Sequence, residues 1–302
     1  MAAGLAVNGF ITLVNITEWL REGRLKLCDK VLTILCLTRF FLLWIFFLEM
    51  IGVLLQLIPF SAFGIYCIFY VFELSLDYFS RWVAMWLSVL YFVMITISKQ
   101  PFMLSLRSKI PSITRSMLWV SILLSFFPAL TYSLTEKDFP CVQNPNTNIS
   151  ANGTSGFPRP FLLTSFFFGH CVPYMMEMVS SVYLLCTLFV HVKHTETKVS
   201  SFSTPNMAAH WSVIRYIFVL NFMSMCNFVA NIFIWFWISD RDTLAVSLSY
   251  IIVYSYPVLH SIVFIQNNLK LKREIQKILH CSKTFCCPKK EPSDSRTQTS
   301  TQ

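Results

Sequence analysis

Residues 256–261, Tyr-Pro-Val-Leu-His-Ser, close the last of seven apolar segments in this chain. A basic stretch, residues 268–273, Asn-Leu-Lys-Leu-Lys-Arg, follows almost at once. A polar pair inside an apolar helix and then a basic segment are typical of a helix that leaves a membrane on its cytoplasmic side. Together with the six apolar segments before it, this ending indicates a helical receptor rather than a pump or an enzyme.

The composition is that of a protein that crosses the membrane several times. Hydrophobic residues make up 55% of the chain and charged residues only 13%, whereas a soluble domain carries about a quarter charged residues. A spanning helix needs about 20 apolar residues. The segments that qualify or nearly qualify are 1–19, 31–57, 66–97, 113–134, 161–191, 212–238 and 243–266.

The order of these segments predicts an all-α membrane protein, a seven-transmembrane-helix bundle over residues 1–280. Apolar residues alternate with basic ones after the last span, which predicts a short amphipathic helix on the membrane surface over 269–280. Residues 281–302 are mostly polar, and we expect a disordered cytoplasmic tail there.

Lys and Arg are distributed unevenly over the loops. The joins between segments one and two, three and four, and five and six carry most of them, together with the tail, whereas the opposite side has only Lys137, Arg159 and Arg241. Since cytoplasmic loops are enriched in Lys and Arg, we expect the N-terminus outside and the C-terminus inside. The net charge of +9 favours contact with anionic membrane lipid. Nucleic-acid binding is not indicated, because the basic residues are scattered among the membrane joins.

The predicted outer loop over 135–160 contains two glycosylation acceptors, Asn148 in Asn-Ile-Ser and Asn152 in Asn-Gly-Thr. Both lie on the side that the Lys and Arg distribution places outside, so they support the same topology. A third triplet, at Asn15, lies at the inner end of the first segment, where we expect no glycosylation.

The ten cysteines do not form a disulfide framework, because several lie inside apolar segments. Cys67 at the outer end of the third segment and Cys141 in the outer loop could pair in an oxidising compartment. Cys281, Cys286 and Cys287 lie beside basic residues at the inner membrane surface. Reversible acylation and free cytosolic thiols are both open for them.

The first segment is short on its outer side. The seven residues before Asn8 supply only about 10 Å of helix, whereas half of the hydrocarbon core is about 15 Å. We therefore expect a first helix that lacks several residues, from an incomplete start or a naturally clipped form.

Five groups of short motifs occur in an order and spacing that resemble the type 2 (bitter) taste receptors, a branch of the G-protein-coupled receptors. They are Asn8-Gly9-Phe10-Ile11 with Val14-Asn15 and Glu18-Trp19; Leu35-Cys36-Leu37-Thr38-Arg39 with Leu42-Leu43-Trp44; Trp82-Val83-Ala84 with Leu87-Ser88-Val89-Leu90-Tyr91-Phe92; Ser203-Thr204-Pro205 with Ala209-His210; and Pro257, His260-Ser261 and Lys270-Leu271-Lys272. The resemblance covers almost the whole chain, from Asn8 to Lys272. It implies a multi-pass plasma-membrane protein that binds a small bitter molecule outside, activates a gustducin-type heterotrimeric G protein inside and needs no cofactor or metal.

Arg39 is the most informative charged residue inside the predicted bundle. A cation in mid-bilayer is costly, so Arg39 must face the bundle interior and find partners there. Asn8 and Ser261 are natural hydrogen-bonding candidates, and the resemblance implies a core network of these residues with Pro257 and His260. Whether such a network only staples the helices or also switches between states stays open.

Glu73 and Asp77 are four residues apart in the third segment and therefore share one helical face. The resemblance implies that both positions line the ligand pocket, where the family usually has Trp and Asn. Two carboxylates this close favour a cation, so one hypothesis is a pocket for amine-bearing ligands. The alternative is that Arg81, four residues beyond Asp77, neutralises the pair.

Three further residues are candidate ligand contacts, and Glu49 is expected at the outer ends of the helices. The candidates are Glu177, Asn227 and Tyr250. On the inner side the resemblance implies a G-protein-facing set, namely Tyr91, His210, Arg215, Lys270 and Lys272. The family commonly has Lys at the positions of Met94 and Arg215, so one of these charges is absent here.

Two other classes of protein are open on the sequence. A transporter or channel could use Arg39, Glu73 and Asp77 as an ion pathway, but no internal repeat occurs in this chain. A truncated receptor that does not signal is the second. An enzyme is disfavoured because no metal, nucleophile or phosphate-loop motif is present. A homo- or hetero-oligomer is neither indicated nor excluded.

Overall fold

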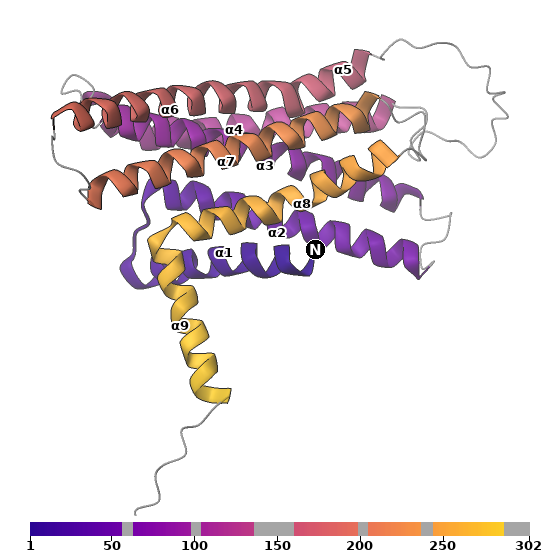
Figure 1. The fold of residues 1–302 in the computed structure, drawn as a ribbon. Helices are drawn as coiled ribbons and strands as arrows, with labels where there is room; N and C mark the ends of the chain where they lie inside the picture. The colour runs from indigo at the N-terminus through magenta and orange to yellow at the C-terminus, as the bar shows by residue number, and fades with distance from the viewer. Residues whose placement is uncertain (56–62, 98–103, 136–159, 199–204, 237–243, 287–302) are drawn as a thin grey trace, which may run out of the picture.

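The computed structural model describes residues 1–55, 63–97, 104–135, 160–198, 205–236 and 244–286, and nearly all of these are helical. The elements are α1 (Ala2–Glu22), α2 (Leu27–Leu54), α3 (Phe63–Ile97), α4 (Leu104–Thr135), α5 (Pro160–Phe166), the π-helical turn η3 (Phe167–Cys171), α6 (Val172–Lys198), α7 (Pro205–Phe236), α8 (Leu244–Asn267) and α9 (Leu269–Cys286). Figure 1 shows the long helices lying lengthwise beside one another, with α9 departing from one end of the bundle and pointing away from it.

Within the described residues, seven helical stretches are long and apolar enough to cross a membrane, with α5, η3 and α6 counted as one continuous span. The predicted seven-helix bundle is therefore confirmed as the fold class. The helix after the last span extends to Cys286, six residues beyond the predicted end at residue 280.

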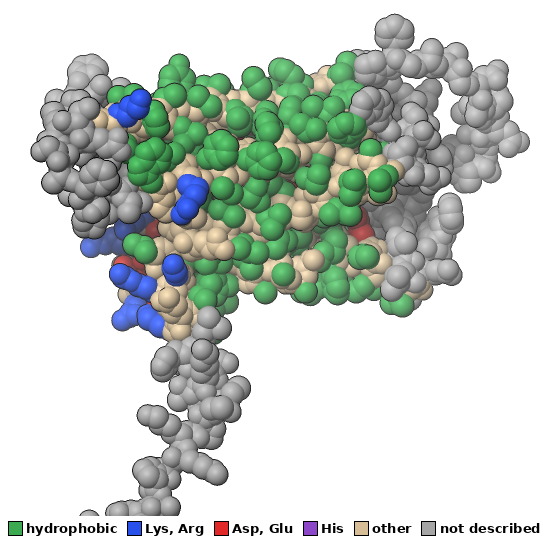
Figure 2. All heavy atoms as spheres, in the orientation of Figure 1, with side chains coloured by type: hydrophobic (Ala, Val, Ile, Leu, Met, Phe, Trp, Pro, Cys, Tyr) green, Lys and Arg blue, Asp and Glu red, His purple; other side chains and the backbone are tan. Residues whose placement is uncertain are grey.

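The outer surface of the bundle is apolar. Trp119, Val190 and Phe218 are each more than 60% exposed, and Figure 2 shows hydrophobic side chains covering the visible side of the spans. An exposed apolar surface of this extent marks a membrane-facing side. Lys and Arg gather at the end from which α9 departs (Figure 2), which is the end that the sequence predicts to face the cytoplasm.

The largest buried cluster lies toward that same end and joins α9 to the spans. It includes Ile11 of α1, Leu35 of α2, Val83 of α3, Phe264 of α8 and Leu271 of α9. Leu271 is completely buried, so the first turn of α9 is part of the core rather than an appendage. Burying one such leucine stabilises by about 1.5–3 kcal/mol.

The fifth span contains a π-helical turn because of Pro173. The Val172 N–H bonds to the Phe167 carbonyl, and the next donor along the chain would belong to Pro173, which has no N–H. The Phe168 carbonyl therefore lacks a π-helical backbone donor. The indole Nε1 of Trp82 on α3 donates to it at 3.2 Å, which ties the third span to the fifth.

Gly169 lies in this turn directly against the ring of Tyr78. A Cβ at Gly169 would lie 2.3–2.6 Å from three atoms of that ring. Tyr78 is completely buried, and its hydroxyl is 2.8 Å from that of Ser165. The ring therefore has little freedom to move away.

We expect Gly169→Ala to destabilise the protein by about 1–3 kcal/mol, the usual cost of overpacking a well-packed core. The measurement is the midpoint of thermal unfolding of purified protein in detergent. Gly9→Ala is the matched control, because a Cβ there would meet Phe40 at 3.4 Å, an ordinary contact. Equal stability of the two variants would contradict this account of the turn.

Candidate functional site

Asn8 on α1 and Ser261 on α8 form a buried hydrogen bond. The Ser261 hydroxyl donates to the Asn8 Oδ1 at 2.8 Å, and the Asn8 amide donates to the Gly4 carbonyl of its own helix at 2.9 Å. Both residues are at most 1% exposed. This bond joins the first and last spans.

Arg39 on α2 is 1% exposed and bonds to α8 one residue away from Ser261. Its Nη1 donates to the Nδ1 of His260 at 2.9 Å, and its Cζ lies 5.3 Å from the centre of the Tyr256 ring. The predicted core residues thus meet as two pairs, Asn8 with Ser261 and Arg39 with His260. Pro257 is buried in the same helix, and its carbonyl also accepts from the Ser261 hydroxyl.

Asp77 is engaged within its own helix. The Nε and Nη2 of Arg81 both donate to the Asp77 Oδ2 at 3.1 Å, and both side chains are partly buried. This geometry matches the alternative in which Arg81 neutralises Asp77. It does not extend to Glu73, whose carboxyl lies within hydrogen-bonding reach of Glu49 on α2.

Two tyrosines of α8 lie near these acids. Tyr250 and Tyr254 stack with ring centres 6.0 Å apart, and Tyr254 meets Phe46 of α2 edge to face at 4.8 Å. Glu73 and Glu49 act electrostatically on Tyr254. The parts of α2, α3 and α8 that the sequence predicts to be outer therefore bring aromatic rings and two carboxyls together.

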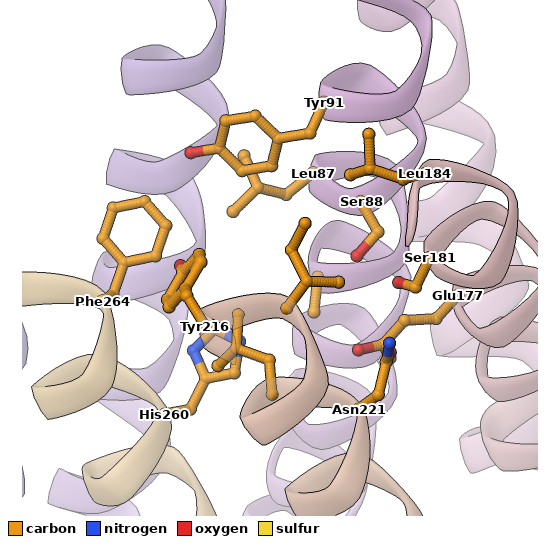
Figure 3. Close-up of a pocket in the computed structure, with 13 residues that line it drawn as sticks. Leu87, Ser88, Tyr91, Glu177, Ser181, Leu184, Tyr216, Asn221, His260 and Phe264 are labelled. Atoms are coloured by element: carbon orange, nitrogen blue, oxygen red, sulfur yellow. The ribbon is translucent and has the colours of Figure 1, made fainter. Parts of the chain in front are cut away.

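The other two candidate contacts lie elsewhere. Asn227 is buried in α7, where its backbone carbonyl and its Oδ1 accept from the amide of Asn231. Glu177 on α6 accepts from the Ser224 hydroxyl at 2.8 Å. It also lines a cavity of about 40 Å³ between α3, α6, α7 and α8, to which neither Glu73 nor Asp77 contributes (Figure 3).

His170 was not singled out by the sequence reasoning. It is 1% exposed and packs against three rings: it stacks on Phe166 at 5.0 Å and meets Tyr78 and Trp235 edge to face at 5.2 and 5.5 Å. Neither of its ring nitrogens has a hydrogen-bond partner among the described residues. The sequence does contain a signal for this site, namely a histidine three residues before a proline inside an apolar span.

The predicted inner-side residues have different surroundings. Tyr91 lines the small cavity with Tyr216, whereas Arg215 and Lys272 are exposed. The Lys270 ammonium is bound to α1, where it donates to the Glu18 carboxylate and, at 2.8 Å, to the Asn15 Oδ1.

Some of the predicted residues lie outside what the structure describes. Asn148, Asn152 and Cys141 fall between residues 136 and 159, and the side chains of Cys67 and His210 are likewise outside the described set. Among the described residues, no group of three or more His, Cys, Asp or Glu side chains could hold a metal ion.

Comparisons with known proteins place this bundle in a family. The model of the family described as "Taste receptor protein (TAS2R)" matches residues 1–283. A relative named Taste receptor type 2 member 39 from Homo sapiens is 26% identical over 91% of this chain and 82% of its own length. One named Taste receptor type 2 member 8 from Gorilla gorilla gorilla is 27% identical over 94% and 93%.

The seven spans define a multi-pass membrane receptor of the G-protein-coupled class, consistent with the plasma membrane. The chain belongs to the Taste receptor protein (TAS2R) family, the bitter taste receptors, and this confirms the resemblance found in the sequence. This is a family of receptors rather than of enzymes.

The two fully buried histidines give a matched pair of variants. We expect His170→Phe to raise the midpoint of thermal unfolding by a few degrees, because an unpaired buried polar group costs about 1–3 kcal/mol. We expect His260→Phe to lower that midpoint, because it removes the acceptor of Arg39. A fall in stability for His170→Phe as large as that for His260→Phe would show that its nitrogens have partners.

Proposed function

We propose that this receptor binds small bitter molecules from the extracellular side and activates a gustducin-type heterotrimeric G protein from the cytoplasmic side. The family match over residues 1–283 is the observation that carries the receptor function. The exposed basic residues Arg215 on α7 and Lys272 on α9 suit contact with a G protein.

We further propose that amine-bearing molecules are preferred agonists. Glu73 and Glu49 face each other from α3 and α2, and the ion pairs of the described residues include neither of them. Two facing carboxyls either share a proton or take up a cation. A ligand ammonium can supply that cation, whereas Asp77 already has one in Arg81.

The aromatic rings beside these acids suit the same ligand. Tyr254 and the Tyr250 stacked on it lie close to Glu73. A cation over a tyrosine face gains about 0.5–2 kcal/mol, most when water is excluded. The acids would bind the charge and the rings would hold the apolar body of the ligand.

The alternative functions receive less support. A transporter or channel would use Arg39, Glu73 and Asp77 as an ion pathway, but Asp77 is bound to Arg81 and Arg39 to His260. A receptor that cannot signal is distinguished by experiment, through surface density measured together with the response.

Glu73→Gln should raise the EC50 of amine-bearing agonists at least tenfold, because the amide keeps the shape and loses the charge. The EC50 of neutral agonists should change by less than about twofold. The measurement is ligand-evoked calcium release in cells that express a gustducin-type or promiscuous G protein, normalised to surface density. A tenfold change corresponds to about 1.4 kcal/mol.

Glu49→Gln should act in the same direction, and Glu274→Gln on the exposed side of α9 is the control variant. Unchanged EC50 values for amines in Glu73→Gln would overturn the amine-binding proposal. Equal shifts for amines and neutral agonists would make Glu73 a structural residue. A wild-type chain that reaches the surface and answers no compound in a broad panel would contradict the proposed receptor function.

A further inference from the structure

The charge of Arg39 has no adjacent counter-ion in the described part of the chain. The ion pairs found there are Arg81 with Asp77, Lys270 with Glu18, and Lys277 with Glu274. A guanidinium only donates hydrogen bonds, so the His260 Nδ1 that receives one is an unprotonated acceptor and His260 is neutral. A buried cation in the membrane is stable only when a charge or strong dipoles compensate it.

A chain of contacts leads from Arg39 to a carboxylate. The Arg39 guanidinium faces the ring of Tyr256, and the Tyr256 hydroxyl lies 3.0 Å from the Ser224 Oγ. The Ser224 hydroxyl donates to the Glu177 Oε1, so the Tyr256 hydroxyl must be the donor in the other bond. Both hydrogen bonds then point toward the carboxylate, an order in which each strengthens the other.

Two arginines, Arg39 and Arg81, lie within electrostatic range of Glu177. Arg81 is already bound to Asp77 through two nitrogens. Arg39 is therefore the cation that remains for Glu177. Their separation by Tyr256 and Ser224 makes this a linked pair rather than a direct salt bridge.

We propose that Glu177 is the counter-ion of Arg39, and that Ser224 and Tyr256 join the two charges into one unit that holds α6 and α7 against α8. We call this set of four residues the transverse unit. It gives Glu177 a positioning role that is distinct from ligand binding, and its effect on signalling rests on the proposed function.

Two further polar side chains line the cavity beside Glu177. Ser181 and Asn221 line it and are more than nine-tenths buried, and neither forms a side-chain hydrogen bond within the described residues. Figure 3 shows both side chains turned toward the same space as the Glu177 carboxylate. A cavity of about 40 Å³ has room for water that could bridge these groups.

The transverse unit links α6, α7 and α8 near their middle. Toward the cytoplasm, Leu184, Leu188 and Ile217 pack together and close the space between α6 and α7. The bond between Ser224 and Glu177 holds α7 to α6, and the bond between Ser224 and Tyr256 ties α7 to α8. Breaking this tie lets α7 move with α6 alone, so we expect the unit to restrain basal signalling.

The charge pairing is tested by three variants: Arg39→Gln, Glu177→Gln and the double variant. Each single variant leaves one buried charge uncompensated, so we expect at least a fivefold loss of surface density and a lower midpoint of thermal unfolding. The double variant should recover at least half of the wild-type surface density. Arg39→Gln combined with Asp77→Asn is the control and should show no recovery. A double variant no better than the worse single variant would overturn the pairing.

The link is tested by Ser224→Ala and Tyr256→Phe, which remove one hydroxyl each and leave both charges in place. Basal signalling per surface receptor should rise at least threefold in each, and the combined variant should not exceed the larger single effect, because the two hydroxyls act as one unit. Ser180→Ala is the matched control on α6, since its hydroxyl bonds only to backbone of its own helix. Tyr183→Phe, at an exposed position, is the control for the tyrosine.

Unchanged basal signalling, or fully additive effects, in a chain whose wild type responds to agonist would overturn the linking role while the proposed function stands. Surface density and thermal unfolding need no G protein. The charge-pair variants therefore test the pairing of Arg39 with Glu177 even if the wild-type chain gives no signal. The absence of a wild-type signal would contradict the proposed function and not the charge pairing.

Discussion

The buried guanidinium of Arg39 needs polar partners, and the helices around the middle of this bundle supply them. A cation at this depth costs several kcal/mol unless polar groups surround it, and α2 cannot supply them from its own apolar sequence. The partners come from other helices, with His260 and Tyr256 on α8 and the chain through Ser224 to Glu177 beyond them. Through these contacts Arg39 on α2 is connected to α8 directly and to α7 and α6 through Tyr256 and Ser224.

The two ends of the bundle are built differently around this middle. At the end from which α9 departs, aliphatic side chains and the buried Leu271 form a continuous core, and Lys270 bonds α9 to α1. Toward the other end, aromatic rings surround His170 and lie beside Glu73. Aliphatic packing suits a surface that must present fixed elements to a partner, whereas rings with polar edges suit recognition of varied small molecules.

The number and class of the spans could be predicted from the sequence because lipid imposes a simple rule of about 20 apolar residues per helix. A hydrogen bond between Asn8 and Ser261 could also be predicted from the sequence, because both are polar residues in the middle of apolar spans. The positions of Glu49 against Glu73, and of Ser224 between Glu177 and Tyr256, were not. They depend on the rotation of each helix about its axis, and weak amphipathicity in lipid-facing helices leaves that rotation undetermined by the sequence pattern.

The π-helical turn shows how a local defect becomes part of the architecture. Pro173 has no N–H, so the Phe168 carbonyl lacks a backbone donor, and the indole N–H of Trp82 donates to it instead. Gly169 allows the Tyr78 ring to approach the turn closely. His170 is enclosed by aromatic rings, and both of its ring nitrogens are unpaired within the described part of the chain. The buried Nε of Arg39 likewise has no hydrogen-bond partner among the described residues. Unpaired buried polar groups reduce the free-energy difference between the native packing and alternative packings. Repacking at the turn and around Arg39 therefore costs less free energy than it would if every buried polar group were paired.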